Sequence, residues 1–236
     1  METVELIRTR EDRKVLQWGG RAGILGGILF IVVFAIVGVF VGTFAGPEVE
    51  LAAYPDVRVA RTFENGLYLL VLVLWVAHFI ALYGALRRTS PAPALYGAGM
   101  GIMSMVMLAA GALPHVVTAP MSDLYHAPGA TPDEQAALVV AWQAAQSVVE
   151  SLLIVGLVIA PIGLLLLGAA MLRTPAFGRR IGRVTVGLGV AGAAAAVVTL
   201  AIPDSPVAAI GIFALIAFHL VVGWRTLRLP TSELAG

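Results

Sequence analysis

Ionisable side chains are scarce in the long apolar stretches of this sequence, so the few that occur there are the residues that could do chemistry. Glu150 is an acid with long uncharged sequence on both sides, and Gln143 and Gln146 precede it at spacings that place all three on one face of a helix. Polar groups at such positions usually face a cavity, a polar partner or water. Two interpretations remain open: a ligand, proton or metal site on this face, or a face solvated at the membrane boundary.

Two further residues are expected near the level of Glu150. Glu150 and Glu64 lie at equal sequence distances before Arg173 and Arg87, and that distance corresponds to about 34 Å of helix. His115 ends another apolar stretch and should reach a similar height. We therefore predict an outward-facing ligand-binding site whose candidate residues are Glu64, His115, Gln143, Gln146 and Glu150, with Asn65 nearby.

A pair of histidines forms the second candidate site. His78 and His219 lie at equal sequence distances before Arg87 and Arg228, corresponding to about 13 Å of helix, so they should share one depth. Two histidines at one depth could relay protons, coordinate a metal or bind haem axially. Alternatively, each donates a hydrogen bond to a neighbouring helix. No recognisable haem-ligation spacing occurs, and we expect no cofactor, with haem and a metal kept as alternatives.

Several functional classes are excluded by what the sequence lacks. There is no cysteine, which excludes disulfides, iron–sulfur clusters and thiol catalysis. No phosphate-binding loop, GxSxG or HExxH motif is present, and no basic stripe interleaved with aromatic residues. We therefore expect no nucleic-acid partner.

The elements that must position these residues are long apolar stretches. The chain has 236 residues, of which 59% are hydrophobic and 12% charged. An ordinary soluble domain has roughly a quarter charged residues. Crossing a bilayer takes about 20 apolar residues in a helix, and a transmembrane barrel would instead show short alternating segments. The predicted spans are 22–45, 67–86, 94–117, part of 136–172, 184–202 and 207–224.

The fourth stretch is too long for one crossing, because its residues would measure about 55 Å as a helix. Thr131 offers a capping hydroxyl, Pro132 suits the first turn, and Asp133 and Glu134 suit the positive end of the helix dipole. We predict a helix that begins outside the membrane and then enters it. Pro161 should kink its buried part.

The basic residues predict which way the chain crosses the membrane. All of the fifteen except Arg58 and Arg61 fall in the N-terminus, the C-terminus and the loops on the same side as both. The opposite loops are rich in Asp and Glu. Basic residues mark the cytoplasmic side, so both termini are predicted to be cytoplasmic.

Small residues at helical spacing predict close contacts between helices, because lipid provides no hydrophobic drive for association. We interpret them as internal packing rather than as a dimerisation signal. The glycines concerned are Gly23, Gly27, Gly97, Gly101, Gly187, Gly189 and Gly192.

The stretch GLLLLGAAMLRTPAFGRRIGRVTVGLGVAG resembles a family of bacterial six-helix membrane proteins known as domain of unknown function 4386. GRAGILGGILFIVVFAIVG and VRVARTFENGLYLLVLVLWVAHFIALYGALRR resemble the opening of that family, so the likeness covers most of residues 20 to 228. The resemblance implies six helices. It implies no activity, ligand or catalytic residue.

Together these features predict an all-α polytopic bundle of six transmembrane helices in a bacterial plasma membrane. Residues 1–21 are expected to form a basic cytoplasmic segment, 22–228 the transmembrane domain and 229–236 a cytoplasmic tail. The leading functional hypothesis is binding or movement of a small lipophilic molecule or a proton at the outward-facing site. One alternative is an intramembrane enzyme with Glu150 as general acid or base. Another is a structural or partner protein without a ligand, and the sequence does not determine the oligomeric state.

Overall fold

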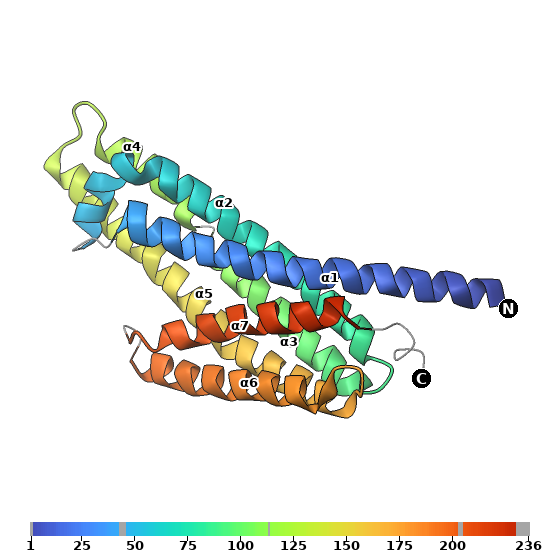
Figure 1. Ribbon diagram of the computed structural model, residues 1–236. Helices are drawn as coiled ribbons and strands as arrows, with labels where there is room; N and C mark the ends of the chain where they lie inside the picture. The colour runs from blue at the N-terminus through green and yellow to red at the C-terminus, as the bar shows by residue number, and fades with distance from the viewer. Residues whose placement is uncertain (1, 43–45, 113, 203–204, 230–236) are drawn as a thin grey trace.

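A computed structural model describes residues 2–42, 46–112, 114–202 and 205–229, with the side chains in those ranges except those of residues 2–10, 114 and 115 (Figure 1). Every regular element in this part of the chain is helical. The elements are α1 (Glu2–Ile36), a π-helix η1 (Val37–Val41), α2 (Pro47–Leu86), α3 (Pro91–Ala112), α4 (Pro114–Tyr125), α5 (Pro132–Arg173), α6 (Gly178–Ala201) and α7 (Ala208–Leu227).

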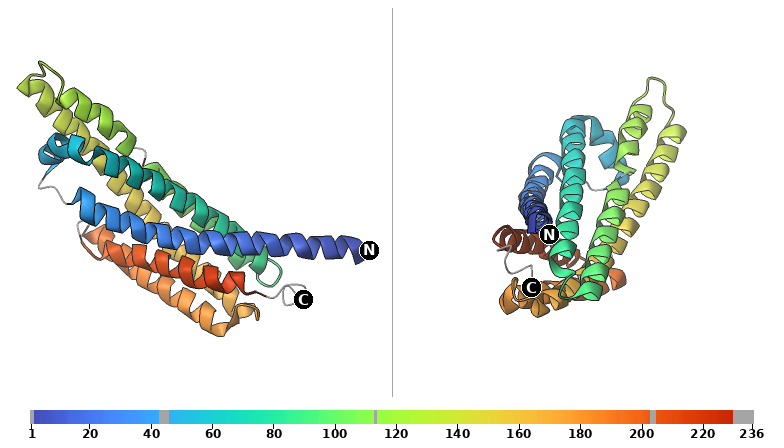
Figure 2. Two further views of the ribbon diagram at one scale, coloured as in Figure 1. Left: turned by 45° about the horizontal axis from the view of Figure 1, so that its top comes forward. Right: turned by 90° about the vertical axis from the view of Figure 1, so that its right-hand side faces the viewer.

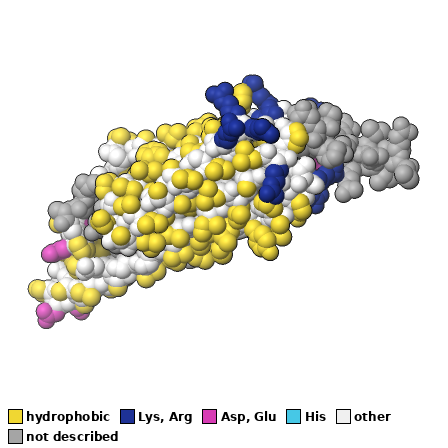
Figure 3. Space-filling view, turned by 90° about the horizontal axis from the view of Figure 1, so that it is seen from below, with side chains coloured by type: hydrophobic (Ala, Val, Ile, Leu, Met, Phe, Trp, Pro, Cys, Tyr) yellow, Lys and Arg dark blue, Asp and Glu magenta, His cyan; other side chains and the backbone are white. Residues whose placement is uncertain are grey.

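Six helical segments among the described residues are long and apolar enough to cross a membrane, with α3 and α4 together counting as one. This confirms the predicted helical class and the number of candidate spans. Their exposed surface is largely apolar along the body of the bundle (Figure 3). Soluble monomers rarely expose apolar patches of this extent.

The six segments form a closed ring. Each packs against its neighbours in sequence, in the order α1, α2, α3, α5, α6 and α7, and contacts between α1 and α7 close the ring (Figures 1 and 2). Residues from facing helices fill most of the interior, with Trp75, Phe79, Leu164 and Phe218 among the largest fully buried side chains. Inward-facing residues from different helices therefore meet in one interior.

The boundaries of three helices differ from the prediction. α2 begins at Pro47, far ahead of residue 67, with proline in the first turn and Glu48 and Glu50 near the positive end of the dipole. The single predicted span 94–117 is divided into α3 and α4, and α4 begins at Pro114, a residue that suits a helix start. α1 runs without a break through the boundary expected at residue 21.

α5 confirms the predicted start signal. Thr131 and Glu134 form a reciprocal capping box, in which the Glu134 backbone N–H donates to the Thr131 hydroxyl and the Thr131 N–H donates to the Glu134 carboxylate. The helix has 42 residues, about 63 Å, and therefore extends well beyond a hydrocarbon layer of about 30 Å. It continues through Pro161, where the predicted kink stays a prediction.

The N-terminal parts of α2 and α5 project beyond the ring together with α4 (Figure 1). A small separate core joins them, formed by Leu51, Tyr54 and Trp142 with partly buried neighbours on α4 and α5. Arg58 on α2 also pairs with Asp123 on α4 through two hydrogen bonds of 2.8 and 2.9 Å. These contacts hold the projecting parts of α2, α4 and α5 together, and we call this region the α2–α4–α5 extension.

Glycines bring the helices close together, as predicted. A Cβ on Gly97 would lie 2.9 Å from the backbone nitrogen of Leu167, and a Cβ on Gly163 would lie 2.9 Å from the carbonyl oxygen of Gly97. The backbones of α3 and α5 therefore touch at this level. Gly23 and Gly27 likewise face α2 and α7 of the same chain. Gly187 differs from the prediction, because a Cβ there would meet nothing within 4 Å.

Candidate functional site

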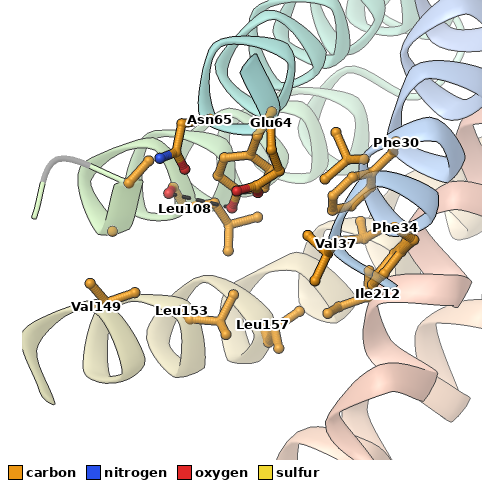
Figure 4. A pocket seen from close by; sticks show the side chains of 15 residues that line it. Phe30, Phe34, Val37, Glu64, Asn65, Leu108, Val149, Leu153, Leu157 and Ile212 are labelled. Atoms are coloured by element: carbon orange, nitrogen blue, oxygen red, sulfur yellow. Dashed lines mark hydrogen bonds between the residues drawn. The ribbon is translucent and has the colours of Figure 1, made fainter. Parts of the chain in front are cut away.

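A cavity of about 220 Å³ lies inside the helical ring, between α1 and η1 on one side and α2, α3 and α5 on the other, with α7 closing one end. Figure 4 shows Val149, Leu153 and Leu157 along its α5 wall, opposite Glu64 and Asn65 on α2. The lining is apolar except for Glu64, Asn65 and Tyr68. All three polar residues come from α2 and lie within four residues of one another, so the polar groups are confined to one wall.

Glu64 is the charged residue of the cavity wall. It is only 8% exposed, and its Oε2 atom is buried without a hydrogen-bond partner in the described part of the chain. The same oxygen lies 3.7 Å from Nη1 of Arg61, which gives an ion pair without a hydrogen bond. One turn further along α2, the Tyr68 hydroxyl donates to the Leu108 carbonyl at 3.4 Å. The Glu64 carboxylate is thus a buried group of the cavity wall that has unused hydrogen-bonding capacity.

Arg61 connects this cavity to a second acid. Its Nη2 atom donates to Oε1 of Glu50 at 3.2 Å, and the Trp142 indole N–H donates to the other Glu50 oxygen at 3.3 Å. The side chains of Arg61, Glu50 and Glu64 are each less than one-fifth exposed. Arg61 pairs with both acids, and its positive charge offsets one of the two carboxylates that share this site.

This cluster was not predicted from the sequence, although its pattern was present. Arg61 follows Glu50 by three helical turns and precedes Glu64 by one turn. The three residues therefore share one face of a helix. The predicted start of the span at residue 67 placed Glu50 and Arg61 in a loop, where spacing has no such meaning. Only the observed start of α2 at Pro47 makes their common face visible.

An open groove adjoins the cavity and contains the polar face of α5. Gln143, Gln146 and Glu150 line it together, which confirms their predicted common face, and Arg61 lines it from α2. Glu150 is exposed. Val149 lines both the groove and the cavity, so the two spaces share this residue.

The predicted outer site is therefore divided between two spaces. Glu64 and Asn65 line the apolar cavity, whereas Gln143, Gln146 and Glu150 line the groove. His115 belongs to α4, but its side chain lies outside the described residues. A single site with Glu64, His115 and Glu150 around one void thus stays a prediction, and the exposure of Glu150 agrees with solvation of this polar face.

His78 and His219 meet directly inside the ring. Their Nδ1 atoms lie 2.8 Å apart, and both residues are fully buried. One Nδ1 must donate and the other must accept, so the two neutral rings have different tautomers. Trp75 stacks on His219 with a centroid distance of 4.2 Å. Gly23 gives His78 its space, because a Cβ there would lie 2.6 Å from Nδ1.

This contact confirms that the two histidines lie at one depth. It also shows that they hydrogen-bond to each other. Both Nε2 atoms are buried without a hydrogen-bond partner within the described residues, as is Nε1 of Trp75. Two imidazole nitrogens on one tetrahedral zinc ion would lie about 3.3 Å apart at bond lengths of about 2.0–2.1 Å. Metal ligation through both Nδ1 atoms would therefore require the rings to separate. Among the described residues, no group of three His, Asp or Glu side chains could hold a metal ion.

Charge is distributed unevenly along the molecule. On the face seen in Figure 3, Lys and Arg side chains gather toward one end and Asp and Glu toward the other. Arg58 and Arg61, the two basic residues that do not follow the sequence pattern, both pair with acids. Their positive charge at the acidic end is therefore neutralised locally.

The chain was compared with family models, with curated proteins and with solved structures, and none of them matches. The resemblance to domain of unknown function 4386 consequently stays a prediction.

Proposed function

We propose that this protein is a multi-pass protein of a bacterial plasma membrane that binds a small lipophilic molecule in the cavity between α1, α2, α3, α5 and α7. The observation that carries the proposal is an apolar cavity within the ring of spans, with polar groups confined to Glu64, Asn65 and Tyr68. Binding sites for small molecules commonly combine an apolar wall with a few convergent polar groups.

The proposed orientation places both termini in the cytoplasm. It is supported by the basic residues, which favour one end of the bundle, while the acids of the α2–α4–α5 extension lie at the other (Figure 3). In this orientation the cavity and the groove lie toward the external face. Ligand would then reach the cavity from the outer leaflet or through the groove.

The cavity volume limits the size of the ligand. A dry engineered cavity of about 150 Å³ binds benzene, so about 220 Å³ accommodates roughly nine non-hydrogen atoms. A longer ligand would have to extend out of the cavity, either into lipid or into the groove. The proposal therefore concerns a compact molecule or the end of a short chain.

The position of the cavity also indicates which acid a bound ligand would contact. The enzyme alternative uses Glu150, but this residue lies exposed in the groove, whereas Glu64 lies buried in the cavity wall. A lipophilic molecule in the cavity would contact Glu64. The proposal therefore assigns contact with the ligand to Glu64.

Filling the cavity tests the proposal. Leu153→Trp places a larger side chain into the cavity from α5, and Val155→Trp places the same side chain on the exposed surface of that helix. In lipid nanodiscs, saturation-transfer NMR with n-octanol and n-octylamine should detect binding to the wild type and to Val155→Trp. It should detect neither probe on Leu153→Trp, with both variants folded by circular dichroism. Equal signals from the two variants would contradict the proposal.

A further inference from the structure

We infer that the ligand of this cavity is a lipophilic amine, whose ammonium group binds the Glu64 carboxylate while its hydrocarbon part fills the apolar cavity. This inference rests on the proposed function and adds the chemical class of the ligand. It follows from the hydrogen bonding of Glu64, from the charge around it and from the apolar nature of the rest of the wall.

The first argument is the free acceptor on Glu64. A buried polar atom without a hydrogen bond is destabilising, because folding has removed its water. Oε2 of Glu64 is such an atom among the described residues, and it belongs to a residue that is more than nine-tenths buried in the cavity wall (Figure 4). An ionised carboxylate only accepts hydrogen bonds, whereas an ammonium group only donates them. A primary ammonium group therefore matches this acceptor.

The second argument is the local balance of charge. Arg61 is the cation of the cluster, and it is shared between Glu50 at 3.2 Å and Glu64 at 3.7 Å. Glu150 lies in the adjoining groove, which Arg61 also lines. Carboxylates therefore outnumber the cation around the cavity. An ammonium ligand would reduce this excess, whereas a carboxylate ligand would increase it.

The longer of the two ion-pair distances shows which acid is available. Glu50 has two partners at hydrogen-bond distance, Arg61 and the Trp142 indole. Glu64 has only the ion pair at 3.7 Å. A ligand cation can consequently approach Glu64 without breaking a hydrogen bond, and Arg61 keeps its bond to Glu50.

The third argument concerns selectivity in a membrane. Lipid chains are as apolar as the wall formed by Phe30, Leu153 and Leu157, so transfer of a hydrocarbon group from lipid into the cavity has little hydrophobic drive. Affinity must then come mainly from polar contacts. Since Glu64 is the charged group of the cavity, the head group of the ligand decides whether it binds.

A series of ligands with one chain and different head groups tests the inference. We would measure binding of n-octylamine, n-octanol and n-octanoate to the wild-type protein in nanodiscs of zwitterionic lipid at neutral pH. Leu153→Trp defines the signal that does not come from the cavity. The expected order is amine, then alcohol, then carboxylate, with the amine binding at least about tenfold more tightly than the alcohol. This ranking needs no substitution at Glu64.

Glu64→Gln then tests the residue itself. It should weaken n-octylamine about tenfold and leave n-octanol within a factor of two or three. The variant is expected to fold, because Arg61 retains Glu50 as its partner. Glu48→Gln is the matched control, since Glu48 is an exposed acid on the same helix and does not line the cavity. It should change neither affinity.

The outcomes separate the two proposals. The amine inference would be overturned if the amine and the alcohol bound the cavity with equal affinity, or if the alcohol or octanoate bound more tightly than the amine. Either result would leave the proposed binding function of the cavity in place. Loss of amine affinity in Glu48→Gln as large as in Glu64→Gln would also overturn it. Binding of all three compounds that persists in Leu153→Trp, or of none, would overturn the proposed function.

Discussion

Replacing either histidine of the buried pair with phenylalanine is expected to destabilise the protein, and replacing both should cost less than the sum of the single changes. Phenylalanine retains a ring that can pack against Trp75 and Phe218. It removes the nitrogens that hold His78 and His219 together at 2.8 Å. The pair therefore allows a double-mutant cycle that isolates one hydrogen bond.

The magnitude follows from the state of the remaining histidine. A single substitution leaves its Nδ1 buried without a partner, which costs about 1–3 kcal/mol. Hydrogen bonds between membrane helices have coupling energies that average about 0.6 kcal/mol and reach about 1.7 kcal/mol. Both histidines are fully buried, so we expect single losses of about 1–3 kcal/mol and a coupling energy of about 1–2 kcal/mol.

Reversible unfolding in mixed detergent micelles, followed by circular dichroism, would give the free energy of unfolding of each variant. The control cycle combines His78→Phe with Trp142→Phe. Trp142 binds Glu50, which lies about 42 Å along α2 from His78. Distant substitutions are additive within about 0.3–0.5 kcal/mol. If the histidine cycle were equally additive, the direct hydrogen bond between the two rings would be refuted.

Three further outcomes follow from the topology, the packing and the histidines. A reporter fused after Arg183 should be cytoplasmic and one inserted at Asp123 external, and the reverse pattern would refute the proposed orientation. Gly163→Ala should lower the free energy of unfolding by about 1–3 kcal/mol because its Cβ would meet the backbone of α3, whereas Gly99→Ala has open space and should not lower it. Equal losses would contradict this packing. Protein purified in detergent should show no Soret band, and a stoichiometric band that disappears on His78→Ala would show that the pair binds haem.

Several features of this protein could be read from residue order alone because they depend on position along a helix. Span number follows from the length of apolar sequence needed to cross a bilayer. Depth follows from the rise per residue, and equal distances to Arg87 and Arg228 correctly placed His78 and His219 at one level. The capping box of Thr131 and Glu134 is local and was likewise predictable.

The tertiary structure decided what each residue faces. In a membrane both lipid and protein interior are apolar, so hydrophobic periodicity does not distinguish the buried side of a helix as it does in water. Glu64 and Glu150 were predicted at similar heights, yet one lines the cavity and the other is exposed in the groove. The pairing of Arg61 with Glu50 required the early start of α2, and the contact of Trp142 with Glu50 required the packing of α5 beside it. Rotation about the helix axis and contacts between helices depend on the whole ring, and they determine where a ligand could bind.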